Sequence, residues 1–403
     1  MNILVIQETD WLTRGPHIQH HIFERLSKNA NFKIFVLDYD IDKTERSKSV
    51  FIKRKVYKNI KKTIRDSKIE VIRTSHLRIP FLRRISSIIT NFFEILKIFR
   101  KNRPNIIVGY SISNGFIGLL ISKLFSVPYV FHYIDFLHSL VPIKYAQNIA
   151  RITARIIFKF ADVVIVHTDL QSKYIIDEGA NPKRIRFLPI GASLDNIGVD
   201  QEEINKIREN LSIKKNEFIL FFMGYLYEFA GLIEIIDYYN QKVKNDHYKF
   251  KFLIVGDGGI YGDLRKYIKK TGAEWVILTG RIPFLKIAEY IQLADLCILS
   301  FKKNIITNQV TPQKIFDYMV MKKPVLSNKL PGVYQQIGVN NGVIFAKNQK
   351  ALIKKIGELI NQKEKLKEIG EIGFNYVKQN HSYQKILNNF CNILRDVLRN
   401  KKV

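Results

Sequence analysis

Cysteine is nearly absent from this chain: Cys297 and Cys391 are the only two among 403 residues. Two cysteines exclude a disulfide framework and a multi-cysteine metal site, and they suit a reducing compartment. The sequence also lacks an uninterrupted apolar run of the roughly 18–20 residues that a membrane-spanning helix needs. The opening segment MNILVIQETD carries acidic residues where a secretory signal peptide would be basic. We therefore expect the chain to work in the cytoplasm, either free or at a membrane surface.

Acidic side chains are scarce relative to basic ones. There are 36 Asp and Glu against 65 Lys and Arg, which leaves a formal net charge of +29. The hydrophobic share of 46% and the charged share of 25% are ordinary for globular proteins, and they exclude a disordered or collagen-like chain. A chain of 403 residues is too long for one compact core, so its length predicts two domains.

The basic surplus of the first half is concentrated in residues 43–104, which hold 19 basic and 4 acidic side chains. A local positive field attracts nucleic acid, anionic lipid or phosphate-bearing substrates. No zinc, helix-turn-helix or RNA-binding signature accompanies the charge, so we expect no nucleic-acid partner. We expect an anionic membrane surface as the partner of this segment.

Apolar residues recur at helical spacing inside this segment, and basic residues lie off their stripe. Two interpretations stay open: a helix that lies apolar face down in an anionic membrane surface, or a helix that packs its stripe on a sheet. We favour packing for the stripe itself and membrane contact for the basic surface around it. The stripe comprises Phe81, Leu82, Ile85, Ile88, Ile89, Phe92, Phe93, Leu96 and Phe99, and the basic residues beside it are Arg83, Arg84, Lys97 and Arg100.

Short apolar strands alternate with helical segments along the chain, a pattern typical of parallel sheets covered by helices on both faces. The pattern restarts after a polar stretch at 193–201, with strands expected at 218–224, 250–256, 276–278, 296–299 and 324–327. We predict an α/β fold of two doubly wound Rossmann-like domains that face each other across a cleft. The expected segments are an N-terminal domain at 1–195, a C-terminal domain at 196–380, and a helix at 381–403 that packs back on the N-terminal domain.

The segment 311–325 contains the most distinctive cluster of polar residues. Pro312 suits the first turn of a helix, whose backbone N–H groups would point at an anion. Lys314 adds a positive charge, and Asp317, one turn later, could accept hydrogen bonds from a ribose. The alternative is a Lys314–Asp317 pair on the surface of an ordinary helix. The glycine turn that begins at Gly256 is by itself weak evidence for a binding site, because glycines at such turns usually serve backbone geometry.

Several short motifs, in the order in which they occur, resemble the family-4 retaining glycosyltransferases of the GT-B architecture. The resemblance extends from residue 1 to about 395 and is strongest at 218–346; the combination is specific, whereas each motif alone is not. It rests on Val255-Gly-Asp-Gly258, Leu278-Thr-Gly-Arg-Ile-Pro283, Ala294-Asp295, Pro312-x-Lys314-x-x-Asp317-Tyr318, Lys323-Pro-Val325, Leu330-Pro-Gly332 and Asn341-Gly342, and in the first half on Arg14-Gly-Pro-His17, Asp135 and Pro189-Ile-Gly191.

The resemblance implies a transferase that moves a sugar from a nucleotide diphosphate sugar with retention of configuration, without a metal or another cofactor. The donor would lie on the C-terminal domain and the acceptor on the N-terminal one. Asp317 takes the place of a carboxylate, usually Glu, that holds the nucleotide ribose, and Lys314 would meet the diphosphate. Gln309 stands where many members have another acid. The other residues that the resemblance assigns to the donor site are Gly15, Gly224, Gly256, Arg281 and Pro312.

A second departure from the family concerns the loop after the first strand of the C-terminal domain. Members often have an Arg after its first glycine and a Lys before the next, where this chain has Tyr225 and Ala230. A departing diphosphate develops negative charge, and stabilising that charge is usually the largest catalytic effect. Lys314, Arg281 and helix N-termini would have to supply the stabilisation. Some branches of the family carry such neutral loops, so we expect an active enzyme.

The candidate catalytic residues lie on the acceptor side. Asp135 follows an apolar strand and has His132 and His138 close by in the sequence, where the family commonly has His-Asp. Either histidine could orient the acceptor hydroxyl, although a lone histidine is more often structural.

Two other clusters resemble metal sites, but we expect no metal. His17, His20 and His21 share a helix face with apparent metal spacing, yet no acid or cysteine accompanies them. The run Asp38-Tyr-Asp40 mimics the metal-binding acids of the other glycosyltransferase architecture. It follows the second strand of a doubly wound domain, so we expect it to be a loop.

These features together predict a hexosyltransferase that extends a lipid-linked or surface glycan, peripheral at the cytoplasmic face of the cell membrane. Two alternatives stay open. A catalytically silent, glycosyltransferase-like subunit is motivated by Tyr225, Ala230 and Gln309. A GT-B nucleotide-sugar epimerase would use a different set of acids and histidines, which the sequence does not contain.

Overall fold

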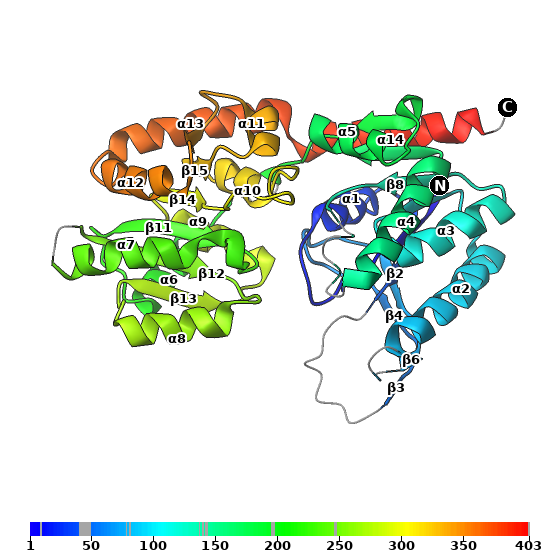
Figure 1. Cartoon of the computed structure of the whole chain (residues 1–403), viewed down its shortest axis with the longest axis horizontal. Coiled ribbons are helices and arrows are strands. Elements are labelled where there is room, and N and C mark those ends of the chain that lie inside the picture. Colours follow the sequence, from blue (N-terminus) through cyan, green and yellow to red (C-terminus); the bar gives the residue numbers. More distant parts are fainter. Residues whose placement is uncertain are drawn as a thin grey trace. The chain divides into compact units, whose positions relative to one another are not determined.

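The computed structural model describes residues 1–8, 10–39, 50–77, 79, 82–136, 138, 141, 144–194, 198–245 and 248–401. The chain divides into two compact units, coloured in sequence order in Figure 1. Unit 1 comprises Met1–Pro189 together with Gln384–Val403, and unit 2 comprises Ile190–Tyr383. The predicted domain boundary between residues 195 and 196 lies outside the described residues, as do Asp40 and Phe81.

Unit 1 is built on an eight-stranded sheet in the order β10-β9-β8-β7-β1-β2-β5-β4. Neighbouring strands run parallel, except that β4 is antiparallel to β5. The central strands are apolar and buried along their length, as expected where helices cover both faces. The strands are β1 (Asn2–Ile6), β2 (Lys33–Asp38), β4 (Lys55–Lys58), β5 (Glu70–Arg73), β7 (Ile106–Gly109), β8 (Tyr129–His132), β9 (Val163–Val166) and β10 (Ile185–Phe187), and β3 (Phe51–Ile52) pairs separately with β6 (His76–Leu77).

The helices of unit 1 come from both ends of the chain. Helix α3 packs between α2 and α4. Helix α14 brings Phe390 edge-on against Phe23 of α1, with ring centroids 5.7 Å apart. The last helix of the chain and the first therefore share one core. The helices are α1 (Ile18–Leu26), α2 (Leu82–Asn102), α3 (Ser113–Leu124), α4 (Lys144–Phe160), α5 (Asp169–Asp177), η2 (Pro182–Arg184) and α14 (Tyr383–Asn400).

Helix α2 turns its predicted apolar stripe away from the sheet. Ile89 and Phe93, in the middle of the stripe, are exposed, and of the described stripe residues only Phe99 is buried. The expectation that the stripe packs on the sheet is therefore wrong for most of its length.

Hydrogen bonds explain why a partly polar face of α2 points inward. Asn91 Oδ1 accepts a hydrogen bond from the hydroxyl of Thr74 at 2.7 Å. Both carboxylate oxygens of Glu94 accept from the guanidinium of Arg54, at 2.7 and 2.6 Å. Buried polar groups that find such partners lose little free energy on leaving water, so this face can be the inner one.

A buried ion-pair network joins the carboxyl ends of β2 and β5 to the loop after β1. The guanidinium of Arg73 lies 2.6 Å from Asp10 Oδ1 and 2.8 Å from Asp38 Oδ2. Asp38 Oδ1 also accepts from the backbone N–H of Trp11 at 2.7 Å and from Gln7 Nε2 at 3.0 Å. Burial raises the pKa of Asp38, and the charge of Arg73 opposes that shift. Asp38 is thus a structural residue at the end of β2, which corrects its assignment to a loop.

Unit 2 contains a fully parallel six-stranded sheet in the order β13-β12-β11-β14-β15-β16. All five predicted strands are present, and β16 was not predicted. The strand order reverses between β11 and β14, the switch point beyond which ligands bind in such sheets. The strands are β11 (Phe218–Met223), β12 (Phe250–Val255), β13 (Val276–Gly280), β14 (Leu296–Leu299), β15 (Val325–Asn328) and β16 (Val343–Ala346).

Helices flank this sheet, and both units are doubly wound α/β bodies, which confirms the predicted fold class. In the part of the chain that the structure describes, no helix combines the length and apolar character needed to cross a bilayer. The helices of unit 2 are α6 (Gln201–Asn210), η4 (Glu228–Ala230), α7 (Leu232–Lys244), α8 (Tyr261–Thr271), η5 (Phe284–Lys286), α9 (Ile287–Gln292), α10 (Lys314–Val320), α11 (Pro331–Ile337), α12 (Gln349–Leu359) and α13 (Lys363–Asn380).

Gly109, at the end of β7, tests the packing of unit 1. A Cβ at this position would overlap the hydroxyl of Tyr129 and lie 2.8 Å from its Cζ, and Tyr129 is fully buried. We expect Gly109→Ala to lower the free energy of unfolding by about 1–3 kcal/mol in urea denaturation. Gly262→Ala is the matched control, because no heavy atom lies within 4 Å of its added Cβ. Equal stability of the two variants would contradict this account of the core.

Candidate functional site

Glycines line the carboxyl ends of three neighbouring strands in unit 2. The N–H of Gly224, after β11, donates to Val255 O at 2.9 Å, and the N–H of Gly256, after β12, donates to Gly280 O at 2.8 Å. A Cβ at position 256 would overlap the carbonyl oxygen of Gly224, and φ is +118° at Gly224 and +141° at Gly256. Only glycine fits both positions without strain. The strand ends therefore form a surface of backbone atoms without side chains, which we call the glycine floor.

The ammonium of Lys314 lies directly beside this floor. Its Nζ is 4.1 Å from the ring centroid of Phe222 and 4.8 Å from that of Phe301. A Cβ at Gly224 would be only 2.8 Å from Nζ, so the glycine also leaves room for the charge. Burial lowers the pKa of Lys314 to about 7, while the Asp317 carboxylate acts in the opposite direction.

Asp317 follows one turn after Lys314 on α10 and is only 8% exposed. Gln313 Nε2 lies 3.5 Å from Asp317 Oδ1 and donates to the carbonyl of Gly191 at 2.7 Å. The hydroxyl of Tyr318 accepts from the N–H of Met223 at 2.9 Å, which ties α10 to the end of β11. Because Lys314 lies against rings and Asp317 is buried, the two do not form a surface pair.

The turn at Pro312 offers fewer free backbone N–H groups to an anion than expected. Helix α10 begins at Lys314 and has seven residues. The N–H groups of Ile315, Phe316 and Asp317 already donate to the carbonyls of Pro312 or Gln313, at 3.2, 3.0 and 3.3 Å. These three N–H groups are therefore not available to an anion, and the side chain of Lys314 carries the full positive charge at the start of this helix.

Gln309 and Arg281 lie farther along the same edge. Gln309 is half-buried in the loop before α10, and its N–H donates to Ile306 O at 3.1 Å. Arg281 directly follows the edge strand β13 and is exposed. Since β12 separates β13 from β11 in the sheet, Arg281 borders the glycine floor from the side opposite to α10.

A row of aromatic rings occupies the loop that lacks the family's basic residues. The ring centroids of Tyr225 and Tyr227 are 4.5 Å apart, those of Tyr227 and Phe229 are 4.6 Å apart, and those of Phe229 and Phe301 are 5.2 Å apart. The row thus runs from the loop to a ring that contacts the Lys314 ammonium. Sequence reasoning treated Tyr225 only as a lost charge. The signal for the row was the aromatic residue at every second position from 225 to 229.

Position 230, where the family often has a lysine, is enclosed in this chain. Ala230 is fully buried, and its carbonyl accepts a hydrogen bond from the hydroxyl of Ser300.

In unit 1, His132 is a core residue. Its Nδ1 accepts from the hydroxyl of Tyr110 at 2.8 Å, and its Nε2 donates to Nε2 of His167 at 3.2 Å. Nδ1–H of His167 in turn donates to Leu188 O at 2.6 Å. These are the tautomers that satisfy the chain, and burial lowers the pKa of both histidines, that of His167 to about 4. Because His132 is fully buried and both ring nitrogens are bonded, it does not qualify for the acceptor-orienting role predicted for it.

Asp135 and His138 lie just beyond the end of β8 and are half-buried. Asp135 Oδ1 accepts from the N–H of Phe136 at 2.8 Å, and burial raises the pKa of this carboxyl to about 6. The ring of His138 is 4.4 Å from that of Phe136 and stacks on Tyr174 at 6.1 Å, and burial lowers its pKa. The structure thus keeps these two candidates together at the edge of the sheet.

A carboxylate that sequence reasoning missed lies at the switch point of unit 1, between β1 and β7. Glu8 follows β1; its Oε1 accepts from the N–H of Asn114 at 2.6 Å, and its Oε2 pairs with Arg84. Arg84 also donates to the hydroxyl of Ser113 at 2.8 Å. The signal was an acid shortly after the first strand. Arg84 is consequently less available to a membrane surface than predicted.

Gly15 and the three nearby histidines belong to the loop and helix after β1. Gly15 is exposed at φ +83°, and a Cβ there would lie 2.8 Å from the nitrogen of His17. His20 is buried against Trp11, where its Nε2 donates to Trp11 O at 3.2 Å and its Nδ1 accepts from His17 N at 3.0 Å. No group of metal-ligating side chains occurs among the described residues.

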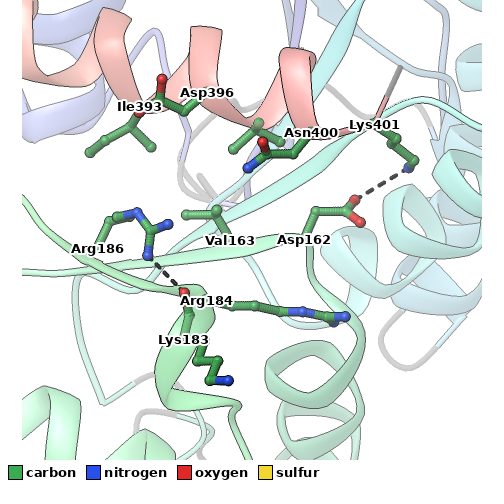
Figure 2. Close-up of a pocket in the computed structure, with 10 residues that line it drawn as sticks. Asp162, Val163, Lys183, Arg184, Arg186, Ile393, Asp396, Asn400 and Lys401 are labelled. Atoms are coloured by element: carbon green, nitrogen blue, oxygen red, sulfur yellow. Dashed lines mark hydrogen bonds and ion pairs between the residues drawn. The ribbon is translucent and has the colours of Figure 1, made fainter. Parts of the chain in front are cut away.

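Figure 2 shows a hollow of about 240 Å³ beside α14 in unit 1. Lys183, Arg184 and Arg186 line one side, and Lys401 lies across from them, 3.3 Å from Asp162 Oδ2. Asp162 immediately precedes β9, and η2 immediately precedes β10. The hollow therefore lies at the amino ends of these strands, away from the edge that carries Asp135.

Comparison with known proteins gives family matches over both units. A model of "Glycosyl transferases group 1" matches residues 203–376, and a model of a "Glycosyl transferase 4-like domain" matches residues 64–191. An uncharacterised glycosyltransferase of Methanocaldococcus jannaschii is 26% identical over 245 residues, and the chain spans 59% of the length of that relative. A putative teichuronic acid biosynthesis glycosyltransferase of Bacillus subtilis, TuaC, is 24% identical over 41% of this chain and 37% of its own.

Solved structures show the same fold over the full length. Anabaena HepE, whose crystal structure contains UDP-glucose, superimposes with a TM-score of 0.74 at 17% identity, covering 98% of this chain and 100% of its own. The family matches over both units, together with this fold, show that the chain belongs to the family-4-like glycosyltransferases of the GT-B architecture.

Proposed function

We propose that this chain is a retaining glycosyltransferase that transfers a hexose from a nucleotide diphosphate sugar to a lipid-linked or surface glycan at the cytoplasmic face of a membrane. The observation that carries the proposal is the Lys314 ammonium beside the backbone floor at Gly224, at the switch point of unit 2. A diphosphate on that floor meets a cation where no side chain obstructs it. Asp317, one turn along α10, is the acceptor for the ribose hydroxyls. The UDP-glucose complex of HepE supports a donor of this class.

Transfer breaks the bond between the anomeric carbon and a diphosphate oxygen, and a bond to the acceptor oxygen forms as that hydroxyl passes its proton to the departing diphosphate. The negative charge that develops on the departing diphosphate is stabilised by Lys314. Asp135, whose pKa burial raises to about 6, is largely ionised at neutral pH and accepts the hydrogen bond of the acceptor hydroxyl. The reaction as proposed needs no metal.

The name of TuaC supports a surface glycan as the acceptor, and the basic surplus of residues 43–104 supports a location at an anionic membrane. The test is a panel of nucleotide sugars with purified protein, scored for release of nucleoside diphosphate and for the anomeric configuration of the product by NMR. Inversion of configuration would overturn retention. Donor binding without release, across the panel and with glycan acceptors, would favour the silent subunit that Tyr225 and Ala230 suggest.

Lys314→Met tests the cation of the donor site. Loss of a charge-assisted interaction should weaken nucleoside diphosphate binding about 10–100-fold in titration calorimetry. The same change should raise stability, because the folded pKa of about 7 lies below the usual 10.5 and charging Lys314 opposes folding. The gain in unfolding free energy should be full below pH 7 and shrink as pH rises towards 10.5. Lys270→Met, on the exposed surface of α8, should change neither quantity.

The pH dependence of donor binding gives an independent test. A bound diphosphate raises the pKa of Lys314, so binding takes up a proton above the free value of about 7. Affinity should fall by up to about tenfold per pH unit above pH 7, where terminal phosphates are already ionised. The Lys314→Met variant should show a flat profile over the same range. A wild-type affinity that is constant from pH 7 to pH 9 would remove Lys314 from the diphosphate site.

Asp317→Asn tests the ribose contact. We expect the variant to bind nucleoside diphosphate about 10–100-fold more weakly, the range for a hydrogen bond to a charged group. The matched probe is the 2′,3′-dideoxy nucleotide, whose affinity should fall by less than that of the ribonucleotide: it has no ribose hydroxyl to lose, and only the effect of Asp317 on the charge of Lys314 remains. If Asp317→Asn weakens ribo- and dideoxynucleotides equally, Asp317 acts on the fold of α10 and not on the ribose.

A further inference from the structure

Three neighbouring helices of unit 1 expose large apolar side chains on their outer faces. Helix α3 packs between α2 and α4, and the three helices lie side by side in Figure 1. Each carries exposed residues spaced three or four positions apart, which places them on one face of the helix. The clearest pairs are Ile89 and Phe93, Leu120 and Leu124, and Ile149 and Ile152, each 51–71% exposed. We call this three-helix surface the docking face.

The exposed residues of the docking face are distinct from the residues with which these helices pack on the rest of unit 1. Each helix has a separate buried side, with Ile98 on α2, Ile121 on α3 and Ile157 on α4 at most 2% exposed. The inner sides therefore already cover the sheet, and the outer apolar residues contribute nothing to that contact. Large exposed apolar residues gathered on adjacent helices are characteristic of protein or membrane interaction sites.

Charge decides between these partners. The three helices carry ten Lys and Arg and one acidic residue, Glu94. Four of the ten pair with acids outside these helices: Arg84 with Glu8, Lys123 with Asp162, and Arg151 and Arg155 with Glu178. Glu94 is buried and its carboxylate is bonded to Arg54, so these helices present no exposed acid. A second copy of the chain would bring the same positive charge against it, which costs free energy. An anionic bilayer complements both the apolar rows and the basic rim.

We propose that the docking face lies in the interface of an anionic membrane, with its apolar rows inserted among the lipid headgroups and its Lys and Arg against the lipid phosphates. This extends the sequence-based expectation, which assigned membrane contact to the basic surface alone. Membrane binding by this face is independent of the proposed function; only its purpose, access to a lipid-linked acceptor, rests on that function. Arg84, at the start of α2, bonds to Ser113 at the start of α3 and pairs with Glu8. The amino ends of α2 and α3, two of the helices that carry the docking face, therefore lie at the switch point of unit 1, where a lipid-linked acceptor would be needed.

The experiment measures sedimentation of the full chain with vesicles of phosphatidylcholine alone or with 30% phosphatidylglycerol. The apolar variant combines Phe93→Gln, Leu124→Gln and Ile149→Gln; all three residues are exposed, so the fold should persist. Its matched control combines Ile305→Gln, Val339→Gln and Ile372→Gln, exposed residues of unit 2. The basic variant combines Lys97→Gln, Arg100→Gln and Lys159→Gln, and its control makes the same charge change at Lys266, Lys269 and Lys270 of α8.

We expect the wild type to prefer anionic vesicles. The apolar variant should lose about 100-fold in partitioning to both lipids, and the basic variant about 100-fold to anionic vesicles only. Both controls should bind as the wild type does. Partitioning equal to wild type for both variants overturns the proposal, and so does a wild-type dimer in light scattering that the apolar variant dissociates without any vesicle binding.

Nucleoside diphosphate binding, measured on every protein, separates this proposal from the function. Vesicle binding as expected without nucleotide binding would leave the docking face in place and overturn the donor site. Nucleotide binding without vesicle binding would leave the donor site in place and overturn the docking face.

Discussion

A lysine ammonium held against aromatic rings at the carboxyl edge of unit 2 constrains the structure around it. Nζ of Lys314 needs a glycine at position 224, and Gly224 in turn leaves no room for a side chain at position 256. The hydroxyl of Tyr318, on the same short helix, holds α10 to the end of β11. The glycine floor, the helix and the strand ends thus depend on a few shared contacts, so a substitution at any of them alters the others.

Aromatic rings and burial act in opposite directions on the charge of Lys314 in unit 2. The faces of Phe222 and Phe301 carry negative potential towards the ammonium of Lys314, which offsets part of the hydration that it has lost. Burial still dominates, because the pKa falls to about 7. The aromatic row begins at Tyr225, where the sequence resemblance led us to expect a basic side chain. Lys314 is therefore only partly charged at neutral pH, and an anion bound beside it would raise its pKa.

The sequence predicted what depends on local pattern and failed where the outcome depends on tertiary neighbours. Alternating apolar segments were enough for the doubly wound fold, and Lys314 of the distinctive motif lies beside the carboxyl end of β11. Helical periodicity showed that α2 has an apolar and a polar side, but not which of them faces inward. The partner of the buried Glu94, Arg54, comes from another segment of the chain. His132 looked like a site residue because nothing local shows that Tyr110 and His167 occupy both of its nitrogens. Glu8 was missed because its contacts lie far along the chain.

Because unit 1 includes α14, it cannot complete its core until α14 has been synthesised. Unit 2 is one continuous segment, whereas unit 1 needs residues from both ends of the chain. Phe390 packs on Phe23 and stacks near His132, so this part of the core stays open until the last helix has left the ribosome. Contacts so distant in sequence form slowly, and open apolar surface of this kind is what chaperones recognise. A chain truncated before α14 would keep all strands of both sheets, yet the core of unit 1 around Phe23 would stay exposed to solvent.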